Sequence, residues 1–292
     1  MHLKNDTRSY ASLLLLAMLL WGGGWTALKI LTQTMPMDVV LFWRFFLMSL
    51  SFLPIIYFFK TPITLTRGSL KYIIFSAILN IAFMVFSFWG IKEGLAGAGS
   101  VIITTFSPIM TFLLVAILFQ SKRSTRQYFG LLLGLIGGYI LLELNNFSLF
   151  LHGANSYFLI CALIWAGVTL LSQHAQKHIH PVHYSFFISL IATLFSFFYA
   201  YNANLSAVFT QDARFWIALI YLAVLGQTVA TTIFFIASGK LGSQKTSSFM
   251  FLVPFFALFS AWLILDEPLQ LHIIIGGFIS MLAVYFINKQ HN

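Results

Sequence analysis

The chain has 292 residues, of which 60% are hydrophobic and 8% are charged, and its mean hydropathy is +0.91. A soluble domain carries about 25% charged residues, so this composition excludes an ordinary soluble protein and indicates a polytopic membrane protein. The net charge of +9 does not indicate nucleic-acid binding, because the basic residues are scattered through short loops. The single cysteine, Cys161, excludes an intrachain disulfide.

Apolar segments of about 20 residues predict membrane-spanning helices. The first follows Lys4 and Arg8, as in a signal peptide, but no convincing cleavage site follows, so we expect it to remain as a helix. The expected fold class is all-α and integral to the membrane, with ten transmembrane helices. They cover approximately residues 10–30, 38–59, 70–91, 98–119, 127–144, 156–174, 183–201, 214–236, 244–265 and 271–287.

Lysine and arginine in the loops predict the orientation, because basic residues are retained on the cytoplasmic side. If the N-terminus is cytoplasmic, most basic residues lie inside, and outside there remain only Lys29, Lys92 and Arg214, with Arg44 within the second helix. The acidic residues show the opposite bias, since only Asp6 lies inside. With ten helices, both termini are cytoplasmic, and the expected location is the inner membrane of the cell.

An internal repeat is visible when the sequence is shifted by 146 residues, half of its 292. The shift aligns Pro108 with Pro254 and Gly130 with Gly276, with a loop between proline and glycine in both copies. Few positions are identical, but the spacing matches. The sequence therefore predicts two related halves.

The predicted halves are residues 1–146 and 147–292, each with five helices. Because five is odd, the second half must enter the membrane upside down. This explains why the turn near Arg123 is basic, whereas its counterpart near Glu267 is acidic. Inverted repeats are typical of secondary transporters, which open one central site to either side. The alternative is a symmetry left from folding history, without alternating access.

Three stretches are typical of one family. They are "LLWGGGWTALK" (residues 19–29), "GLAGAGSVIITTFSPIMTFLLVAILF" (residues 94–119) and "GKLGSQKTSSFMFLVPFFALFSAWLILDEPL" (residues 239–269). With Pro36 and Arg44, they make the chain similar to the ten-helix EamA-type permeases of the drug/metabolite transporter superfamily. The resemblance covers nearly the whole chain. It implies export or exchange of small metabolites, amino acids among them, through a cavity between the halves. Ser121 departs from it, because members usually carry a glutamate there.

Polar residues at mid-membrane are default site candidates, because they need a partner or a wet cavity. Asn80 and Gln227 lie near the middle of the third and eighth predicted helices, within one residue of repeat-equivalent positions. We expect the two amides to face each other and bind substrate; hydrogen bonding between helices is the alternative. Arg44 is a candidate for binding a substrate carboxylate, and the alternative is a snorkelling side chain that ties helix ends.

Three tryptophans, Trp21, Trp25 and Trp165, are predicted at the centre of the membrane and not at its interfaces, where tryptophan is usual. Their rings are candidates for the apolar walls of a substrate site, and simple packing is the alternative. The prolines Pro108 and Pro254 are expected to kink their helices and to free backbone carbonyls for a substrate.

Hydroxyl groups before the first proline are further candidates. Thr104 is predicted to bind substrate, and Thr105 and Ser107 lie beside it. The alternative is that these hydroxyls only satisfy the backbone groups that the kink leaves open.

A histidine cluster, His174, His178, His180 and His183, supports the main alternative function. His174 and His178 share a helical face at a spacing that suits metal ligation, so the alternative is a metal-dependent membrane enzyme. A solvated loop is the simpler explanation of the cluster, because metal boxes of this kind need more histidines. We therefore expect no enzyme, no catalytic residue, no metal and no cofactor.

The sequence thus predicts a secondary transporter that moves small neutral, zwitterionic or aromatic solutes, in the direction of export. The expected partners are a small-molecule substrate and the lipid bilayer. Nucleic acid is not expected, and a homodimer is left open.

Overall fold

The computed structural model describes residues 7–59, 65–93, 96–119, 124–141, 153–266 and 271–288. Within these ranges the chain is helical and contains no strand. The turns predicted near Arg123 and Glu267 lie outside the described residues, as does Ser121. The prediction of an all-helical fold is confirmed.

The first half supplies five uninterrupted α-helices. They are α1 (Thr7–Thr34), α2 (Met37–Phe59), α3 (Arg67–Glu93), α4 (Ala96–Phe119) and α5 (Thr125–Leu141). Pro54 and Pro108 lie inside α2 and α4 without ending them.

The second half contains irregular helices. After α6 (Ala154–Ala175), α7 (Pro181–Tyr199) and the short 3-10 helix η2 (Leu205–Thr210), α8 (Ala213–Ile220) continues through the π-helix η3 (Tyr221–Val229) into α9 (Ala230–Leu241). The next helical stretch consists of α10 (Ser243–Ser248), the 3-10 helix η4 (Phe249–Leu252) and α11 (Val253–Leu265). It is followed by α12 (Leu271–Asn288).

Nine helical stretches in the described ranges are long and apolar enough to cross a membrane, judged by length and composition. The remaining long helix, α5, has 17 described residues, slightly fewer than the roughly 20 that a span needs. The chain is therefore a multi-pass membrane protein, and the tenth span remains a prediction.

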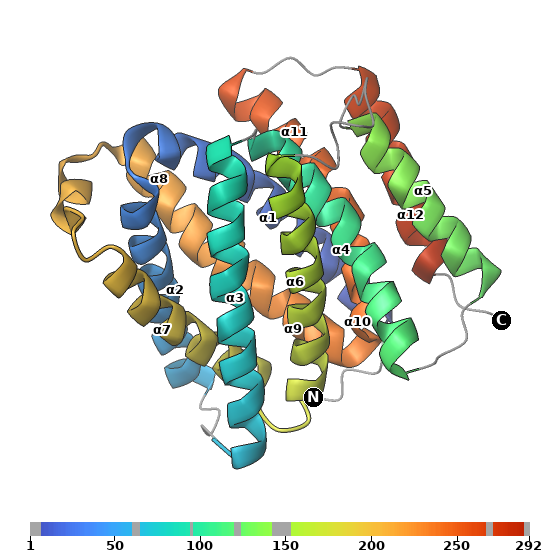
Figure 1. Cartoon of the computed structure of the whole chain (residues 1–292), viewed down its shortest axis with the longest axis horizontal. Helices are drawn as coiled ribbons and strands as arrows, with labels where there is room; N and C mark the ends of the chain where they lie inside the picture. The colour runs from blue at the N-terminus through green and yellow to red at the C-terminus, as the bar shows by residue number, and fades with distance from the viewer. Residues whose placement is uncertain are drawn as a thin grey trace.

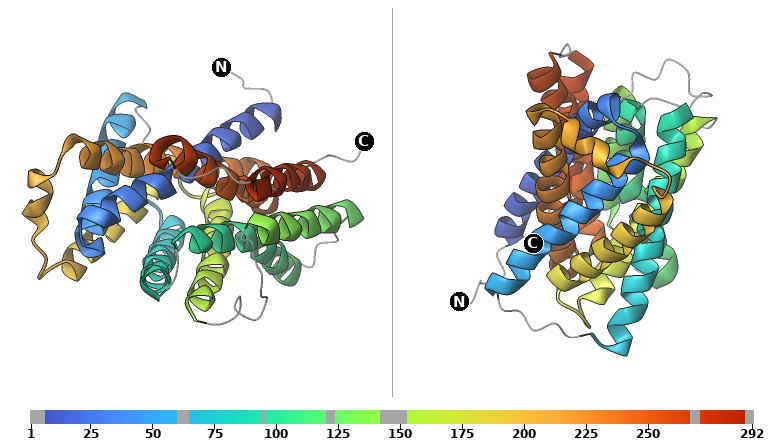
Figure 2. Two further views of the ribbon diagram at one scale, coloured as in Figure 1. Left: turned by 90° about the horizontal axis from the view of Figure 1, so that it is seen from above. Right: turned by 90° about the vertical axis from the view of Figure 1, so that its left-hand side faces the viewer.

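The helices at the two edges of the bundle pack in pairs. In Figure 1, α2 packs on α7 at one edge, and α5 packs on α12 at the other. Viewed from above in Figure 2, α5 and α12 again lie side by side at one end. Between the edges, α1 packs on α9 and α11, whereas α6 packs on α3 and α4. The first helix of each half therefore packs against helices of the other half.

Glycines allow α5 and α12 to approach closely. A Cβ atom on Gly130 would lie 2.6 Å from Cγ1 of Ile287 and 3.0 Å from the carbonyl oxygen of Ala283. A Cβ atom on Gly276 would lie 2.6 Å from Cγ of Leu141 and 3.1 Å from the carbonyl oxygen of Gly137. Each position in the second set differs from its counterpart in the first by 146 residues, forward for the glycine and backward for its partners. Small residues at such interfaces are typical of helix packing in membranes.

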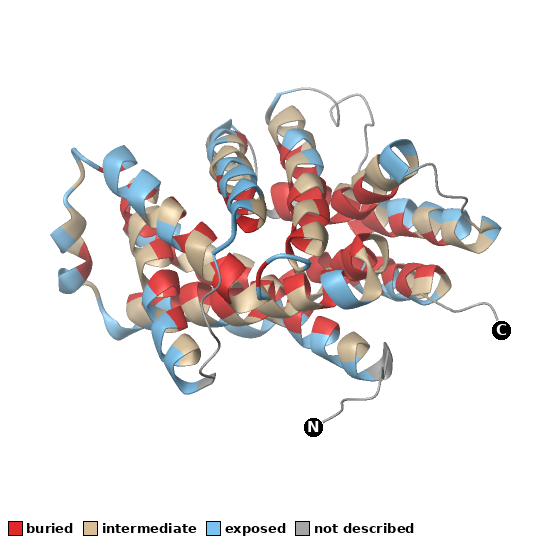
Figure 3. Ribbon diagram, turned by 90° about the horizontal axis from the view of Figure 1, so that it is seen from below, coloured by how far each residue is buried: buried red, intermediate tan, exposed pale blue. Residues whose placement is uncertain are grey.

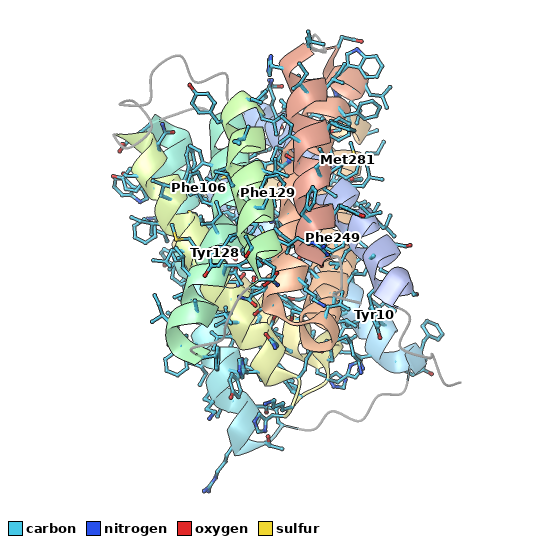
Figure 4. The ribbon with its side chains drawn as sticks, turned by 90° about the vertical axis from the view of Figure 1, so that its right-hand side faces the viewer. Tyr10, Phe106, Tyr128, Phe129, Phe249 and Met281 are labelled. Atoms are coloured by element: carbon cyan, nitrogen blue, oxygen red, sulfur yellow. The ribbon has the colours of Figure 1, made fainter. Side chains whose placement is uncertain are left out.

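The outer surface is apolar. Buried residues gather on the inward faces of the helices, and the outward faces are exposed (Figure 3). On the α5–α12 pair, Phe129 and Met281 are 47% and 45% exposed and project outward (Figure 4). A soluble monomer does not expose apolar surface on this scale, so this surface fits a lipid environment.

Candidate functional site

A cavity of about 140 Å³ lies between the two halves. Its lining comes from α1, α2, α3, α4, α6, η3, η4 and α11. One water molecule needs only about 10–15 Å³ of this kind of space, so the cavity has room for a small organic molecule. It reaches Met37, the first residue of α2. The cavity thus extends from the middle of the bundle to the end where α1 meets α2, which we call the α1–α2 end.

An aromatic cluster forms the deep side of the cavity. The ring centroids of Trp21 and Trp165 are 5.6 Å apart in an edge-to-face arrangement, and those of Trp21 and Phe234 are 4.9 Å apart. The ring centroid of Phe83 lies 5.3 Å from that of Trp165. We call these four residues the aromatic floor. Such pairs are about 0.5–1.5 kcal/mol more stable than their buried area alone implies.

The described residues close the opposite end of the bundle. Ala175, Ile179, Tyr184 and Phe235 are buried there in the main apolar cluster, to which Trp165 and Phe234 of the floor also belong. The Tyr184 hydroxyl is hydrogen-bonded to Ser76 of the other half. Among the described residues, the cavity therefore leads to the α1–α2 end, and the opposite end is packed.

Arg44 is the one charged side chain among the described residues that line the cavity. Its Nε is buried and has no hydrogen-bond partner, and no described carboxylate forms an ion pair with it. Its guanidinium carbon lies 5.7 Å from the ring centroid of Phe45. An unpaired charge in an apolar setting is costly, so this guanidinium is available for an anionic or strongly polar guest.

Other polar groups in the lining include hydrogen-bonding atoms without a protein partner. Trp165 is 9% exposed, and its buried Nε1 has none. The side-chain amide of Gln227 also makes no hydrogen bond within the described ranges. The hydroxyl of Thr104 donates to the carbonyl oxygen of Ser100 at 2.7 Å, which leaves its oxygen free to accept. Donors outnumber acceptors in this set.

The π-helix η3 supplies one wall. Leu222, Gly226 and Gln227 all belong to it and line the cavity. The hydroxyl of Thr228 lies 3.2 Å from the carbonyl oxygen of Ala223, five residues earlier, as the wide turn allows. Short π-helical segments are frequent at functional sites.

The two predicted helix breaks, Pro108 and Pro254, are buried and do not line the cavity. A proline removes the hydrogen bond to the carbonyl four residues earlier, which is that of Thr104 for Pro108 and of Met250 for Pro254. Both of those residues line the cavity. In the second half, the backbone N–H of Val253 donates to the carbonyl of Met250 in the 3-10 turn. The prolines therefore act on the wall indirectly.

Asn80 is placed apart from the other predicted residues. It lines a second cavity of about 170 Å³ between α2, α3 and α7, and its amide nitrogen donates to the carbonyl of Ser76 at 2.8 Å. Leu41, Met84 and Phe88 belong to both cavities and separate them. The structure thus brings Trp21, Trp25, Arg44, Thr104, Trp165 and Gln227 to one cavity and leaves Asn80 beside it.

The histidines make local contacts. The ring of His174 stacks on that of Phe119 with a centroid distance of 5.4 Å, and the ring of His178 stacks on that of Tyr72 with a centroid distance of 5.5 Å. His180 caps α7 by accepting from the backbone N–H of Val182 at 3.4 Å. The described residues contain no group of three or more side chains arranged to hold a metal ion.

The sequence matches the EamA-like transporter family twice, over residues 8–142 and 153–289. The chain belongs to the EamA-like transporter family. Members of this family are transporters and not enzymes, so the chain is a membrane transporter, and the prediction that it is no enzyme is confirmed.

Named relatives agree with this family. The chain is 25% identical over 275 residues to "Uncharacterized transporter YoaV" of Bacillus subtilis, covering 91% of this chain and 92% of that protein. It is 25% identical over 296 residues to a "Probable amino-acid metabolite efflux pump" of Salmonella typhimurium, covering 96% and 94%. A crystal structure with 14% sequence identity superposes with a TM-score of 0.75 over 96% of this chain and 97% of the other, which shows the fold.

Sequence reasoning missed most of the apolar lining, including Leu41, Phe83, Met84, Phe88 and Leu222. In a chain with 60% hydrophobic residues, no feature separates an apolar residue that faces a cavity from one that faces lipid. Met250 had a usable signal, because the 146-residue shift aligns it with Thr104. The missed residues make the cavity mainly apolar.

Proposed function

We propose that the protein exports a small amphipathic metabolite by alternating access. The observation that supports this best is the cavity between the halves, which reaches the α1–α2 end and stops at the aromatic floor. A static channel would need a path through both ends, whereas the opposite end is packed with apolar residues. The conformation described here would be one of two states.

In the proposed topology, residues 1–146 and 147–292 form inverted five-helix repeats, ten helices span the inner membrane, and both termini are cytoplasmic. The α1–α2 end then faces outward. Two observations support the repeat: the family matches twice, and Gly130 and Gly276 make corresponding contacts. The basic residues of the predicted inner loops support the orientation.

The proposed solutes are amino acids or similar neutral, zwitterionic or aromatic metabolites. The apolar lining with few polar groups suits them, and a relative named a probable amino-acid metabolite efflux pump supports both the solute class and the direction. In this proposal Trp21, Trp25, Arg44, Thr104, Trp165 and Gln227 form the substrate site. Asn80 contributes from the second cavity, and Pro108 and Pro254 shape the walls.

Efflux from proteoliposomes tests the proposal. Vesicles with the purified protein are loaded with labelled amino acids and compared with protein-free vesicles. We expect faster release for at least one aromatic or aliphatic amino acid, and Trp165→Ala should reduce it because Trp165 joins the floor and the lining. Absence of protein-dependent movement for all amino acids and related metabolites would contradict the proposal.

A further inference from the structure

The strongest unmatched chemistry in the cavity is the positive charge of Arg44. Two described acidic residues at this end of the bundle are engaged elsewhere: Asp212 caps α8 by accepting from the backbone N–H of Phe215 at 2.9 Å, and Asp38 accepts from the backbone N–H of Val39 at 2.9 Å. Neither forms an ion pair with Arg44. The guanidinium is therefore not neutralised by a described carboxylate of its own chain.

The remaining free groups point to the same kind of guest. The Nε of Arg44 and the Nε1 of Trp165 are buried donors without a partner, and Trp165 is nine-tenths buried. Either donor would be satisfied by an acceptor oxygen of a guest. A carboxylate suits a guanidinium best, because its two oxygens match the planar fork of donors.

The other lining residues suit a guest with a single negative charge. Lysine, aspartate and glutamate are absent from the described lining residues, which are mostly apolar and include Trp25, Leu41, Phe83 and Phe88. A second anionic group would lack a counter-charge, and an ammonium group would find the amide oxygen of Gln227 and aromatic faces but no carboxylate. The wall therefore favours an apolar or aromatic body with a single carboxylate.

We propose that Arg44 is the carboxylate-binding residue of the cavity and that the substrates are amphipathic monocarboxylates, with any α-ammonium group contributing little to affinity. This inference rests on the proposed function, because it treats the cavity as the transport site.

Binding to the full-length protein in detergent tests the inference with three matched probes at pH 7. They are 3-phenylpropionate, its neutral amide 3-phenylpropionamide, and phenylalanine, and tryptophan fluorescence reports occupancy. We expect the carboxylate to bind about 10- to 100-fold more tightly than the amide, the range for hydrogen bonds to charged groups. Phenylalanine should bind with an affinity similar to that of 3-phenylpropionate.

Variants of Arg44 test whether this residue causes the preference for the carboxylate over the amide. Arg44→Gln should bind the carboxylate and the amide equally, and Arg44→Lys should keep part of the preference, since it keeps the charge but not the fork. Arg214→Gln, which removes an exposed arginine from α8, is the matched control and should behave as the wild type. If Arg44→Gln does not fold, the wild-type comparison and Arg44→Lys still decide.

The outcomes separate the inference from the proposed function. Equal affinity of the wild type for carboxylate and amide, absence of binding by all three probes, or a preference that survives in Arg44→Gln would overturn the inference. If phenylalanine efflux from proteoliposomes occurs without carboxylate preference, the inference fails and the transport function stands. If the preference is found but no solute moves, the binding site stands and the transport function fails.

Discussion

The first and second halves of the sequence differ in the regularity of their helices. In the first half, α3 and α4 are continuous α-helices of 27 and 24 residues. The helices that the 146-residue shift aligns with them are interrupted, one by the π-helix η3 and the other by the 3-10 helix η4. By contrast, α5 and α12 make corresponding glycine contacts.

The difference shows where the molecule has irregular backbone. Both interruptions contribute lining residues, Gln227 from η3 and Met250 from η4. In membrane proteins, irregular backbone occurs where it is buried in protein or lines a cavity. We infer that the second half forms the adaptable wall of the cavity, and that α3 and α4 form the rigid wall.

The largest expected effect is a loss of stability at the glycine contacts between α5 and α12, which are similar in the two halves. Gly130→Ala and Gly276→Ala each place a Cβ atom 2.6 Å from a side-chain carbon of the partner helix. Overpacking of this kind costs about 1–3 kcal/mol, so we expect similar losses of stability in both variants, measured by unfolding in mixed micelles. A loss in only one of them would mean that the two contacts are not equivalent.

An intermediate effect on transport is expected at η3, the π-helix that has no equivalent in α3. Gln227→Ala removes an amide that lies free in the cavity, and we expect transport to fall about tenfold, as for the loss of one substrate hydrogen bond. Asn80→Ala removes an amide already bonded to Ser76, so we expect a smaller transport defect than in Gln227→Ala and a stability loss of about 0.6 kcal/mol.

Rates from proteoliposomes with equal protein content would check this pair. A larger transport defect in Asn80→Ala than in Gln227→Ala would reverse the assignment of the adaptable wall and indicate that the second cavity carries substrate.

The smallest effect concerns His180 at the closed end. Partial burial lowers the pKa of His180 below its usual value of 6.5, because desolvation disfavours the charged imidazolium. The stability from this cap is therefore present above about pH 6.5 and is lost as the pH falls through the lower folded-state pKa. His180→Asn keeps a capping side chain that does not titrate.

Melting temperatures of the wild type and His180→Asn between pH 8 and pH 5 would measure this effect. The wild type should lose stability relative to the variant on acidification. A constant difference across the range would show that protonation of His180 is not linked to folding.

Much of the fold was predictable, because hydropathy reports helices directly. The predicted segments 38–59 and 98–119 nearly coincide with α2 and α4. The interruptions η3 and η4 were not predictable, because a π-turn or 3-10 turn has the same apolar composition as an α-helix. Only Pro254, two residues after the end of η4, indicated one of them.

The residues of the candidate site could be predicted where a polar or bulky side chain is rare in an apolar helix. This is why Arg44, Gln227 and the three tryptophans could be selected, and all of them line one cavity. Asn80 was selected by the same rule but faces a neighbouring cavity. A one-residue difference in register along a helix turns a side chain by about 100°, and an alignment of weakly similar halves does not resolve it.

The central claim is that the second half is an inverted copy of the first, and cysteine accessibility tests it most directly. Thr125 and Leu271 begin α5 and α12, both are exposed, and they are 146 residues apart. In a Cys161→Ser background, single cysteines at these positions are labelled in intact cells with a membrane-impermeant maleimide. The account predicts that Leu271→Cys reacts from outside and that Thr125→Cys reacts only after the membrane is permeabilised. Reaction of both positions from the same side would contradict it.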